Sequence, residues 1–355
     1  MHIHELDTPA LVVDLDVMER NLSRMADYAR EHALRLRPHT KTHKIPALGA
    51  RQLALGAAGL TVAKVSEAEV MLASGDKDLL IAYPIFGAEK MRRLVEVAKK
   101  TRVTVSVDSM ETARPISKAA AEAGVTIGVL AEVDAGLHRV GVQPELFVDL
   151  LEDLAPLPGV ELRGMAFYPG HIKNQDPAPL SALSTLIQGL VSDATAAGFE
   201  LPVVSGGSTP TMWHSHAVAG MNEIRPGTYI FNDRNTIISG ACTMADCAAT
   251  ILATVVSTAV PGQFVIDGGS KTFSSDKAAA DGFGTFTDAP DAYFEKMNEE
   301  HGYVKHPGHN RKVGERVRVL PNHICVAVNL HEKIYGIRGE EVVETWTVAG
   351  RGKLQ

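Results

Sequence analysis

The sequence predicts an α/β protein: a (β/α)8 barrel of the TIM type followed by a smaller all-β domain. Three observations lead to this fold class. Strand-like and helix-like segments alternate eight times over roughly 220 residues, the number and length typical of such a barrel. Helical periodicity then ends near residue 240, where short β-rich runs begin. Reactive side chains also recur where the predicted strands end, which is where barrel enzymes carry their chemistry.

The eight predicted strands are short apolar runs bounded by turn residues. They occupy residues 34–37, 60–65, 79–83, 103–107, 126–133, 162–167, 203–205 and 223–225. Before the first strand, Asp16 is expected to cap a helix to about His32, with Met18, Leu22 and Met25 on one apolar stripe. An open, doubly wound sheet is the alternative fold. It would require a glycine-rich turn after the first strand, and the sequence has none there.

Beyond residue 240, β-rich runs are separated by glycine, proline and aspartate. They lie at residues 249–256, 263–266, 317–320, 324–328 and 342–348. Residues 278–309 are polar and lack periodicity, so we expect a long loop there. The predicted domains are a barrel over residues 10–238 and a β-domain over 239–355 that also includes residues 1–9.

Composition excludes several classes of function. The chain has 355 residues and a net charge of −7, so a basic surface for nucleic acid is not expected. No apolar run reaches the length that spans a membrane. Three cysteines are an odd number, and the N-terminus lacks the basic-then-apolar layout of a signal peptide. We therefore expect a cytoplasmic protein without a disulfide framework.

Two lysines and two histidines crowd the exit of the first predicted strand, in the octet Arg37-Pro-His39-Thr-Lys41-Thr-His43-Lys44. A protonated lysine amine is a poor nucleophile. Cationic or desolvating neighbours lower the pKa of the amine. The amine then loses its proton and can condense with a carbonyl. The octet by itself fits two interpretations equally well: a basic surface loop, or a lysine that anchors an aldehyde cofactor.

Later strand ends carry further candidates. The run Ser205-Gly206-Gly207-Ser208-Thr209-Pro210 suits a phosphate, because glycines allow close approach of backbone amides and the proline begins a helix. A plain turn is the competing interpretation. Arg139 is able to hold a phenolate or carboxylate, or to form a salt bridge at the barrel rim. Tyr229, Tyr168 and His171 also follow predicted strands.

The β-domain contains His323 and Cys325 two residues apart. In a strand this spacing places both side chains on one face, and imidazole with thiolate suits zinc. Two protein ligands leave coordination positions open, as a catalytic metal requires. The competing interpretation is a buried cysteine beside a polar histidine.

Together these motifs resemble the fold-type III pyridoxal-phosphate enzymes of the D-threonine aldolase and D-serine dehydratase group. The resemblance rests on the octet at 37–44, on Gly206-Gly-Ser-Thr-Pro-Thr211 and on Arg225-Pro-Gly-Thr-Tyr229. It covers nearly the whole chain, from Asp7 to Cys325. It implies an alanine-racemase-like barrel, a β-domain and a homodimer that acts on a small D-amino acid. The composition described above predicts no nucleic-acid or membrane partner.

The resemblance also implies roles for individual residues. Lys41 would bond covalently to pyridoxal 5'-phosphate, and His171 would lie near the metal as a second catalytic residue. His323 and Cys325 would bind a divalent metal (zinc, manganese or magnesium). The remaining cofactor-binding residues would be His39, Arg139, Tyr168, Ser205, Gly206, Gly207, Ser208, Thr209 and Tyr229.

Two lyase reactions are compatible with this set. The first is D-threonine aldolase-type cleavage of a D-3-hydroxy amino acid to glycine and an aldehyde. The alternative is dehydration of the D-serine dehydratase type, giving a 2-oxo acid and ammonia. Aldolases of the group typically carry aspartate at the position of Cys325. The dehydratases carry cysteine there, as this chain does. Amino-acid racemisation is a third possible reaction. A different class of protein is a carrier that binds the cofactor without catalysis, and the β-domain with its His-x-Cys pair argues against it.

Overall fold

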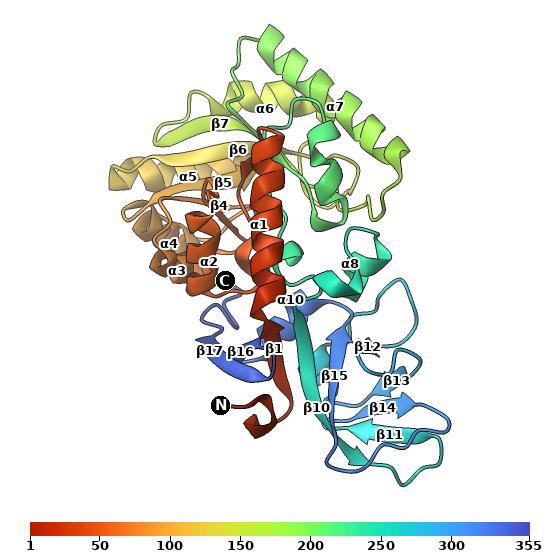
Figure 1. Cartoon of the computed structure of the whole chain (residues 1–355). Coiled ribbons are helices and arrows are strands. Elements are labelled where there is room, and N and C mark those ends of the chain that lie inside the picture. Colours follow the sequence, from red (N-terminus) through yellow and green to blue (C-terminus); the bar gives the residue numbers. More distant parts are fainter. The chain divides into compact units, whose positions relative to one another are not determined.

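The structure is a computed structural model that describes residues 1–355, and the chain falls into two compact units. The barrel unit contains Met25–Lys41, Pro46–Gly227 and Lys353–Gln355. The strand-rich unit contains Met1–Arg24, Thr42–Ile45 and Thr228–Gly352. Figure 1 shows the elements of both. None of the helices combines the length and apolar composition that crossing a membrane demands.

Eight parallel strands form the sheet of the barrel unit, in the order β2-β9-β8-β7-β6-β5-β4-β3. Strands β5 and β6 are buried along nearly their whole length, as expected when helices cover one face of a parallel sheet and the barrel core fills the other. Each predicted strand has a counterpart, which confirms the fold class. The bounds are β2 Arg35–Leu36, β3 Leu60–Val62, β4 Asp78–Ile81, β5 Arg102–Val107, β6 Ile127–Val133, β7 Val160–Phe167, β8 Val203–Gly206 and β9 Glu223–Ile224.

Backbone hydrogen bonds close this sheet into a ring. On one side of β2, Leu36 pairs with Ile224 of β9. On the other side, His39 forms a parallel bridge with Thr61 of β3, and the Thr61 amide donates to the Pro38 carbonyl at 2.8 Å. A closed ring leaves no unpaired sheet edge. The open, doubly wound alternative is therefore excluded.

Helices follow the barrel strands in turn (Figure 1). Helix α1 (Leu15–Glu31) precedes β2, and its predicted stripe of Met18, Leu22 and Met25 is buried. The predicted cap at Asp16 is wrong: the carboxylate of Asp14 accepts from the Val17 amide at 3.1 Å. The later helices are α2 Pro46–Ala54, α3 Val65–Met71, α4 Ala88–Ala98, α5 Met110–Ala123, α6 Phe147–Leu154 and α7 Pro177–Ala196.

The strand-rich unit is built on a nine-stranded sheet with the order β13-β14-β11-β10-β1-β16-β17, in which β15 pairs with β10 and β12. Strand β1 pairs antiparallel with β10 and parallel with β16, so residues 10–14 belong to this sheet, although the predicted boundaries assigned them to the barrel. The bounds are β1 Ala10–Asp14, β10 Ala249–Ser257, β11 Gln263–Ile266, β12 Gly284–Phe286, β13 Tyr293–Met297, β14 Gly302–Lys305, β15 Arg316–Pro321, β16 Lys333–Arg338 and β17 Glu341–Thr347.

Two predictions for this unit are wrong. Residues 278–309 are not one long loop, because they contain β12, β13 and β14. These strands are three to five residues long, and each buries a single side chain: Phe286, Phe294 and Val304. Strands this short give no recognisable apolar periodicity within a polar segment.

The second error concerns residues 324–328, which form helix α10 (Ile324–Leu330) and not a strand. Ile324, Ala327 and Val328 are its buried positions, a helical i, i+3, i+4 spacing. A short apolar run of this kind suits either structure until the tertiary contacts are known. Helices α8 (Arg234–Ile238) and α9 (Ser270–Phe273) also belong to this unit, so it is mostly, and not purely, β.

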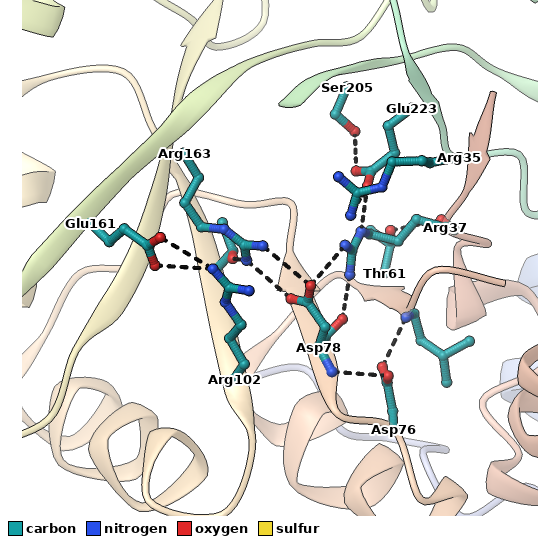
Figure 2. Close-up of polar contacts among 12 residues, drawn as sticks. Arg35, Arg37, Thr61, Asp76, Asp78, Arg102, Glu161, Arg163, Ser205 and Glu223 are labelled. Carbon is teal, nitrogen blue, oxygen red and sulfur yellow. Dashed lines mark hydrogen bonds and ion pairs between the residues drawn. The ribbon is translucent and has the colours of Figure 1, made fainter. Parts of the chain in front are cut away.

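Paired charges cross the interior of the barrel unit (Figure 2). Arg37 donates through Nε to Glu223 Oε2 at 2.9 Å, and its Nη2 lies 3.2 Å from Asp78 Oδ2. Asp78 also accepts from Arg163 Nη1 at 3.1 Å. Burial by itself lowers the pKa of Arg37, but Glu223 and Asp78 reverse the effect and raise that pKa overall. Each buried charge therefore has the partner that makes its burial tolerable.

Candidate functional site

The structure separates the two lysines of the octet. Lys44 is buried, and its Nζ donates to Asn329 Oδ1 at 2.8 Å within the strand-rich unit. Lys41 lies in the 3₁₀ turn η2 (Thr40–Thr42) and is exposed. Its Nζ lies 6.0 Å from the centroid of the Tyr168 ring, which follows β7 of the barrel unit. Lys41 is therefore the candidate amine for bonding a carbonyl.

Arg139 and His171 lie with Lys41 around the carboxyl ends of the barrel strands. The Arg139 guanidinium is 4.8 Å from the Tyr168 ring centroid. A Cβ atom added to Gly136 would come within 3.2 Å of the His171 ring, so the His171 imidazole packs on the loop that leads to Arg139. Four predicted site residues, Lys41, Arg139, Tyr168 and His171, are thus brought to one end of the barrel.

The loop carrying Arg139 is shaped by Asp134 at the end of β6. One Asp134 carboxylate oxygen accepts from the amides of Gly136 at 3.0 Å and His138 at 2.9 Å, and the other lies 2.8 Å from His138 Nδ1. Burial opposes ionisation, but these hydrogen bonds lower the pKa of Asp134 overall. His138 adopts a left-handed φ of 56°, which the Asp134 contacts hold in place.

The predicted phosphate cradle has the backbone geometry of an anion site. Gly207, directly after β8, has φ 82°, a conformation that favours glycine. Ser208 precedes the 3₁₀ helix η5 (Thr209–Ala217) and gives it no side-chain cap. The first-turn amides of η5 are therefore not capped by Ser208 and suit a phosphate. The Gly227 amide donates to Thr209 Oγ1 at 3.2 Å, which ties the segment after β9 to the cradle.

Ser205 belongs to the buried charge network and does not present its hydroxyl to the cradle. Its Oγ donates to Glu223 Oε1 at 2.7 Å and accepts from Arg225 Nη1 at 2.6 Å. Arg225 also donates to the Phe167 carbonyl at 2.9 Å. Burial lowers the pKa of Arg225, and Glu132 and Glu223 oppose that shift. Ser205 and Arg225 therefore hold strand ends β7, β8 and β9 together beneath the cradle.

His39 and Tyr229 are two further residues that were predicted to bind the cofactor. His39 closes the barrel ring through its backbone, and its Nδ1 accepts from the Lys41 amide at 3.4 Å. His39 thus shapes the turn that carries Lys41. Tyr229 is buried in the 3₁₀ turn η6 (Thr228–Ile230) of the strand-rich unit.

In the strand-rich unit, His323 and Cys325 form the core of a polar cluster. His323 precedes α10 and Cys325 lies in its first turn, so the two side chains converge without a strand. The carboxylate of Asp233 lies 3.0 Å from His323 Nδ1 and accepts from the Ile324 amide at 3.0 Å. Two threonine hydroxyls flank the Cys325 sulfur: Thr42 at 3.3 Å and Thr228 at 3.6 Å.

This cluster fits a divalent metal. The Asp233 carboxylate on Nδ1 leaves Nε2 of His323 as the nitrogen that would bind a metal in place of its proton, the usual outer arrangement of a metal-bound histidine. The negative charge of the Cys325 thiolate, together with the Asp233 carboxylate, raises the pKa of His323 to about 11. The site therefore favours a positive charge next to a soft sulfur ligand.

Asp233, Thr42 and Thr228 are members of this polar cluster that the sequence-based prediction missed. Asp233 caps α8, accepting from the Thr236 amide at 2.9 Å, and an aspartate before a helix was the only available signal. Nothing in the spacing connects Asp233 to a histidine 90 residues later. Thr42 lies inside the octet, but only the lysines and histidines of that segment were considered as reactive residues.

Comparison with protein families divides the chain in a similar way. Residues 13–235 match the family model described as alanine racemase, N-terminal domain. Residues 248–337 match the model described as putative serine dehydratase domain. The alanine racemase model alone accounts for well over half of the chain.

Individual relatives cover almost the full length. A D-threonine aldolase from an Arthrobacter species is 31% identical, over 98% of this chain and 93% of its own. The solved D-threonine aldolase from Filomicrobium marinum is 33% identical, with a TM-score of 0.94 over 99% of this chain and 98% of its own. The solved D-threo-3-hydroxyaspartate dehydratase from Delftia sp. HT23 is 31% identical, with a TM-score of 0.87 over 98% of both chains.

Two solved variants of a relative bear on the cluster of His323 and Cys325. One structure of D-threo-3-hydroxyaspartate dehydratase is a cysteine-to-alanine variant in the metal-free form. Another is a histidine-to-alanine variant at the position two residues earlier. The chain belongs to the family of pyridoxal-phosphate-dependent lyases that unites an alanine racemase N-terminal domain with a serine dehydratase domain and includes the D-threonine aldolases.

Proposed function

We propose that this protein is an aldolase that cleaves D-3-hydroxy amino acids, such as D-threonine, to glycine and an aldehyde with the help of pyridoxal phosphate and a divalent metal. The observation that carries the proposal is the likeness in backbone. The TM-score is 0.94 with a D-threonine aldolase and 0.87 with a dehydratase of nearly equal sequence identity.

The cofactor's binding groups come from the barrel unit. Lys41 would supply the exposed amine that bonds the aldehyde carbon, and the amides after β8 would supply the phosphate site. Arg139, 4.8 Å from the Tyr168 ring, supplies a fixed positive charge for the phenolic oxygen. When bound, the cofactor supplies an electron sink for the carbanion left at Cα.

His323 and Cys325 would hold the metal, and a divalent metal would lower the pKa of the substrate's β-hydroxyl. A thiolate ligand favours zinc over the harder magnesium or manganese. Since Asp233 holds His323 Nδ1 at 3.0 Å, the ring keeps one orientation whether or not the metal is bound.

Retro-aldol cleavage requires removal of the β-hydroxyl proton. His171 is the proposed base, because it is exposed and packs against the loop of Arg139. Lys41 would need only to give up the cofactor's carbonyl carbon to the amino group of the substrate and to take it back after cleavage. The proton taken from the β-hydroxyl balances the one that Cα must gain to give glycine. No α-proton is lost in this reaction.

Dehydration is the second candidate, and Cys325 is the observation that favours it. The pair His323 and Cys325 has the spacing of the histidine and cysteine replaced in the dehydratase variants. In this reaction Lys41 removes the α-proton, and the β-hydroxyl leaves. Racemisation would need a second base on the opposite face, and no residue is assigned to that role.

Product analysis separates the two lyase reactions. Purified enzyme loaded with pyridoxal phosphate and Zn²⁺ or Mn²⁺ should convert D-threonine to glycine and acetaldehyde in equal amounts. Chromatography of the amino acids and a coupled assay for 2-oxobutyrate measure both outcomes in one sample. Release of 2-oxobutyrate without glycine would reject the aldolase in favour of the dehydratase.

Asp233→Asn is expected to weaken the binding of the catalytic metal about 10- to 100-fold, the usual cost of losing an outer partner of a metal-binding histidine. The amide retains the size of the side chain and one acceptor for the Ile324 amide. The apparent metal affinity is read from activity against free Zn²⁺ concentration. Excess metal should restore most of the activity, whereas a loss that no metal concentration restores would contradict this role for Asp233.

A small amino acid as substrate follows from the activities of the relatives. The homodimer expected from the family resemblance is part of the same proposal. Size-exclusion chromatography with light scattering tests that state directly.

A further inference from the structure

We propose that His2, His4 and Glu340 form a second divalent-metal site, which clips the N-terminal segment to the β16–β17 hairpin. The ligand atoms of these three side chains lie within 4.8 Å of one another. They belong to the strand-rich unit and share no residue with the His323 and Cys325 cluster. The proposed ligand is a borderline transition-metal ion such as Zn²⁺.

The ligand geometry is close to that of a metal centre. His2 Nε2 lies 3.1 Å and His4 Nε2 4.0 Å from the two oxygens of the Glu340 carboxylate. Metal–ligand bonds of about 2.0–2.2 Å place neighbouring ligands of a tetrahedral ion about 3.4 Å apart. Since no two of the ligand atoms lie more than 4.8 Å apart, shifts of about 1.5 Å or less bring them to that spacing, which is within the freedom of exposed side chains.

The backbone on both sides is already held in place. His2 and Glu341 form an antiparallel bridge, the Ile3 amide donates to the Glu340 carbonyl at 2.8 Å, and the Val342 amide donates to the Met1 carbonyl at 2.8 Å. Ile3 and Leu6 are buried in one apolar cluster with Val12, Leu252 and Ile337. The site is thus largely preorganised, which lowers the entropic cost of binding.

Glu340 is positioned by a tight turn. Arg338 pairs with Glu341, so Gly339 and Glu340 form a two-residue hairpin loop, and Gly339 has the left-handed φ of 58° that such a loop needs. Carboxylates of Glu5 and Glu341 are close by: Glu5 accepts from the His2 amide at 2.6 Å, and Glu341 lies 3.7 Å from the Met1 amine. Three carboxylates, Glu5, Glu340 and Glu341, outnumber the single Met1 ammonium, so the local charge is negative and favours a cation.

The chemistry of the ligand set identifies the class of ion. Two imidazoles and one carboxylate, with an open position toward solvent, match the ligand set of zinc sites that keep a water molecule. Coordination through His2 Nε2 puts the ring proton on Nδ1, so the 3.2 Å hydrogen bond from the His4 amide to that atom is given up. Without metal, His2 Nε2 and Glu340 remain a surface hydrogen-bonded pair, and His2 Nδ1 caps η1 (Ile3–Glu5) by accepting from the His4 amide.

The test uses the complete enzyme loaded with pyridoxal phosphate, stripped with chelator and titrated with Zn²⁺ in a calorimeter. Wild type should bind one ion more per chain than His4→Gln or Glu340→Gln, and each variant should weaken that binding event on the order of 100-fold, at least as much as loss of an outer partner does. His301→Gln is the matched control, because it removes an exposed histidine elsewhere in the same unit and should leave the stoichiometry unchanged.

Two readouts separate this site from the catalytic metal. Turnover should be the same in wild type and in His4→Gln at saturating Zn²⁺, because neither His4 nor Glu340 takes part in the reaction. Zn²⁺ should also raise the melting temperature of wild type more than that of Glu340→Gln. Equal stoichiometry and affinity in wild type and both variants would overturn the proposal. If His323 and Cys325 bind no metal, the variants would instead fall from one ion to none.

Discussion

Lys41→Ala is expected to abolish the visible absorbance band of lysine-bound pyridoxal phosphate and to reduce turnover on the order of 10³-fold or more, as loss of a covalent catalytic residue usually does. The physical reason is that alanine has no amine to bond the aldehyde carbon. The cofactor's phosphate would still have the amides after β8 to bind. The variant should therefore bind the cofactor weakly and release it on gel filtration, which absorbance and turnover measured before and after the column would detect.

Lys44→Met is the control for this experiment. It removes an amine from the same octet and retains the apolar stem, but the amine it removes is committed to Asn329 at 2.8 Å. Its absorbance band should persist, while its free energy of unfolding falls by about 1–3 kcal/mol because Asn329 loses a buried partner. A band that survives in Lys41→Ala and disappears in Lys44→Met would show that the two lysines have been assigned in reverse.

Glu223→Ala is expected to lower the free energy of unfolding by about 3–5 kcal/mol, the usual cost of removing one partner of a buried ion pair. Glu223 is fully buried, and its carboxylate accepts from Arg37 Nε at 2.9 Å and from Ser205 Oγ at 2.7 Å (Figure 2). Alanine would leave the Arg37 guanidinium in the barrel interior with Asp78 as its only carboxylate partner. Urea unfolding followed by circular dichroism measures the change.

Glu161→Ala is the matched control in the same unit. Glu161 pairs with Arg102 at 3.1 Å, but both side chains are about half exposed, so losing the pair should cost at most about 1 kcal/mol. Figure 2 shows the two ion pairs together. Similar losses in Glu161→Ala and Glu223→Ala would mean that burial does not decide the strength of these pairs. A small loss for Glu223→Ala would indicate that water enters the barrel interior and solvates Arg37.

The network also explains why Glu223 was not recognised as a site-supporting residue. In the sequence it appears as a charge in a two-residue strand, β9, with no periodicity to set it apart. Its partners Arg37 and Asp78 come from other strands. Only closure of the ring, through His39 and Thr61, places the three side chains in one interior. Contacts between distant segments carry no local sequence signal.

The cluster of His323 and Cys325 was also predicted only in part, for a different reason. The i, i+2 spacing of His323 and Cys325 was interpreted through a strand, and the segment is a helix start. The convergence of the two side chains is found nonetheless, because a residue just before a helix and a residue in its first turn also lie close together. Asp233, which orients His323, lies 90 residues away and joins the cluster through the cap of α8.

The sequence by itself determined the alternation of strands and helices, the fold class and the strand ends at which Lys41, Arg139, Tyr168, His171 and the cradle residues lie. These features are local: they follow from periodicity, turn residues and motif spacing. The tertiary structure alone decided which lysine is committed to Asn329, which hydroxyl belongs to the buried charges, and which carboxylate holds His323. Those facts depend on pairings between segments far apart in the chain, and no local pattern encodes such pairings.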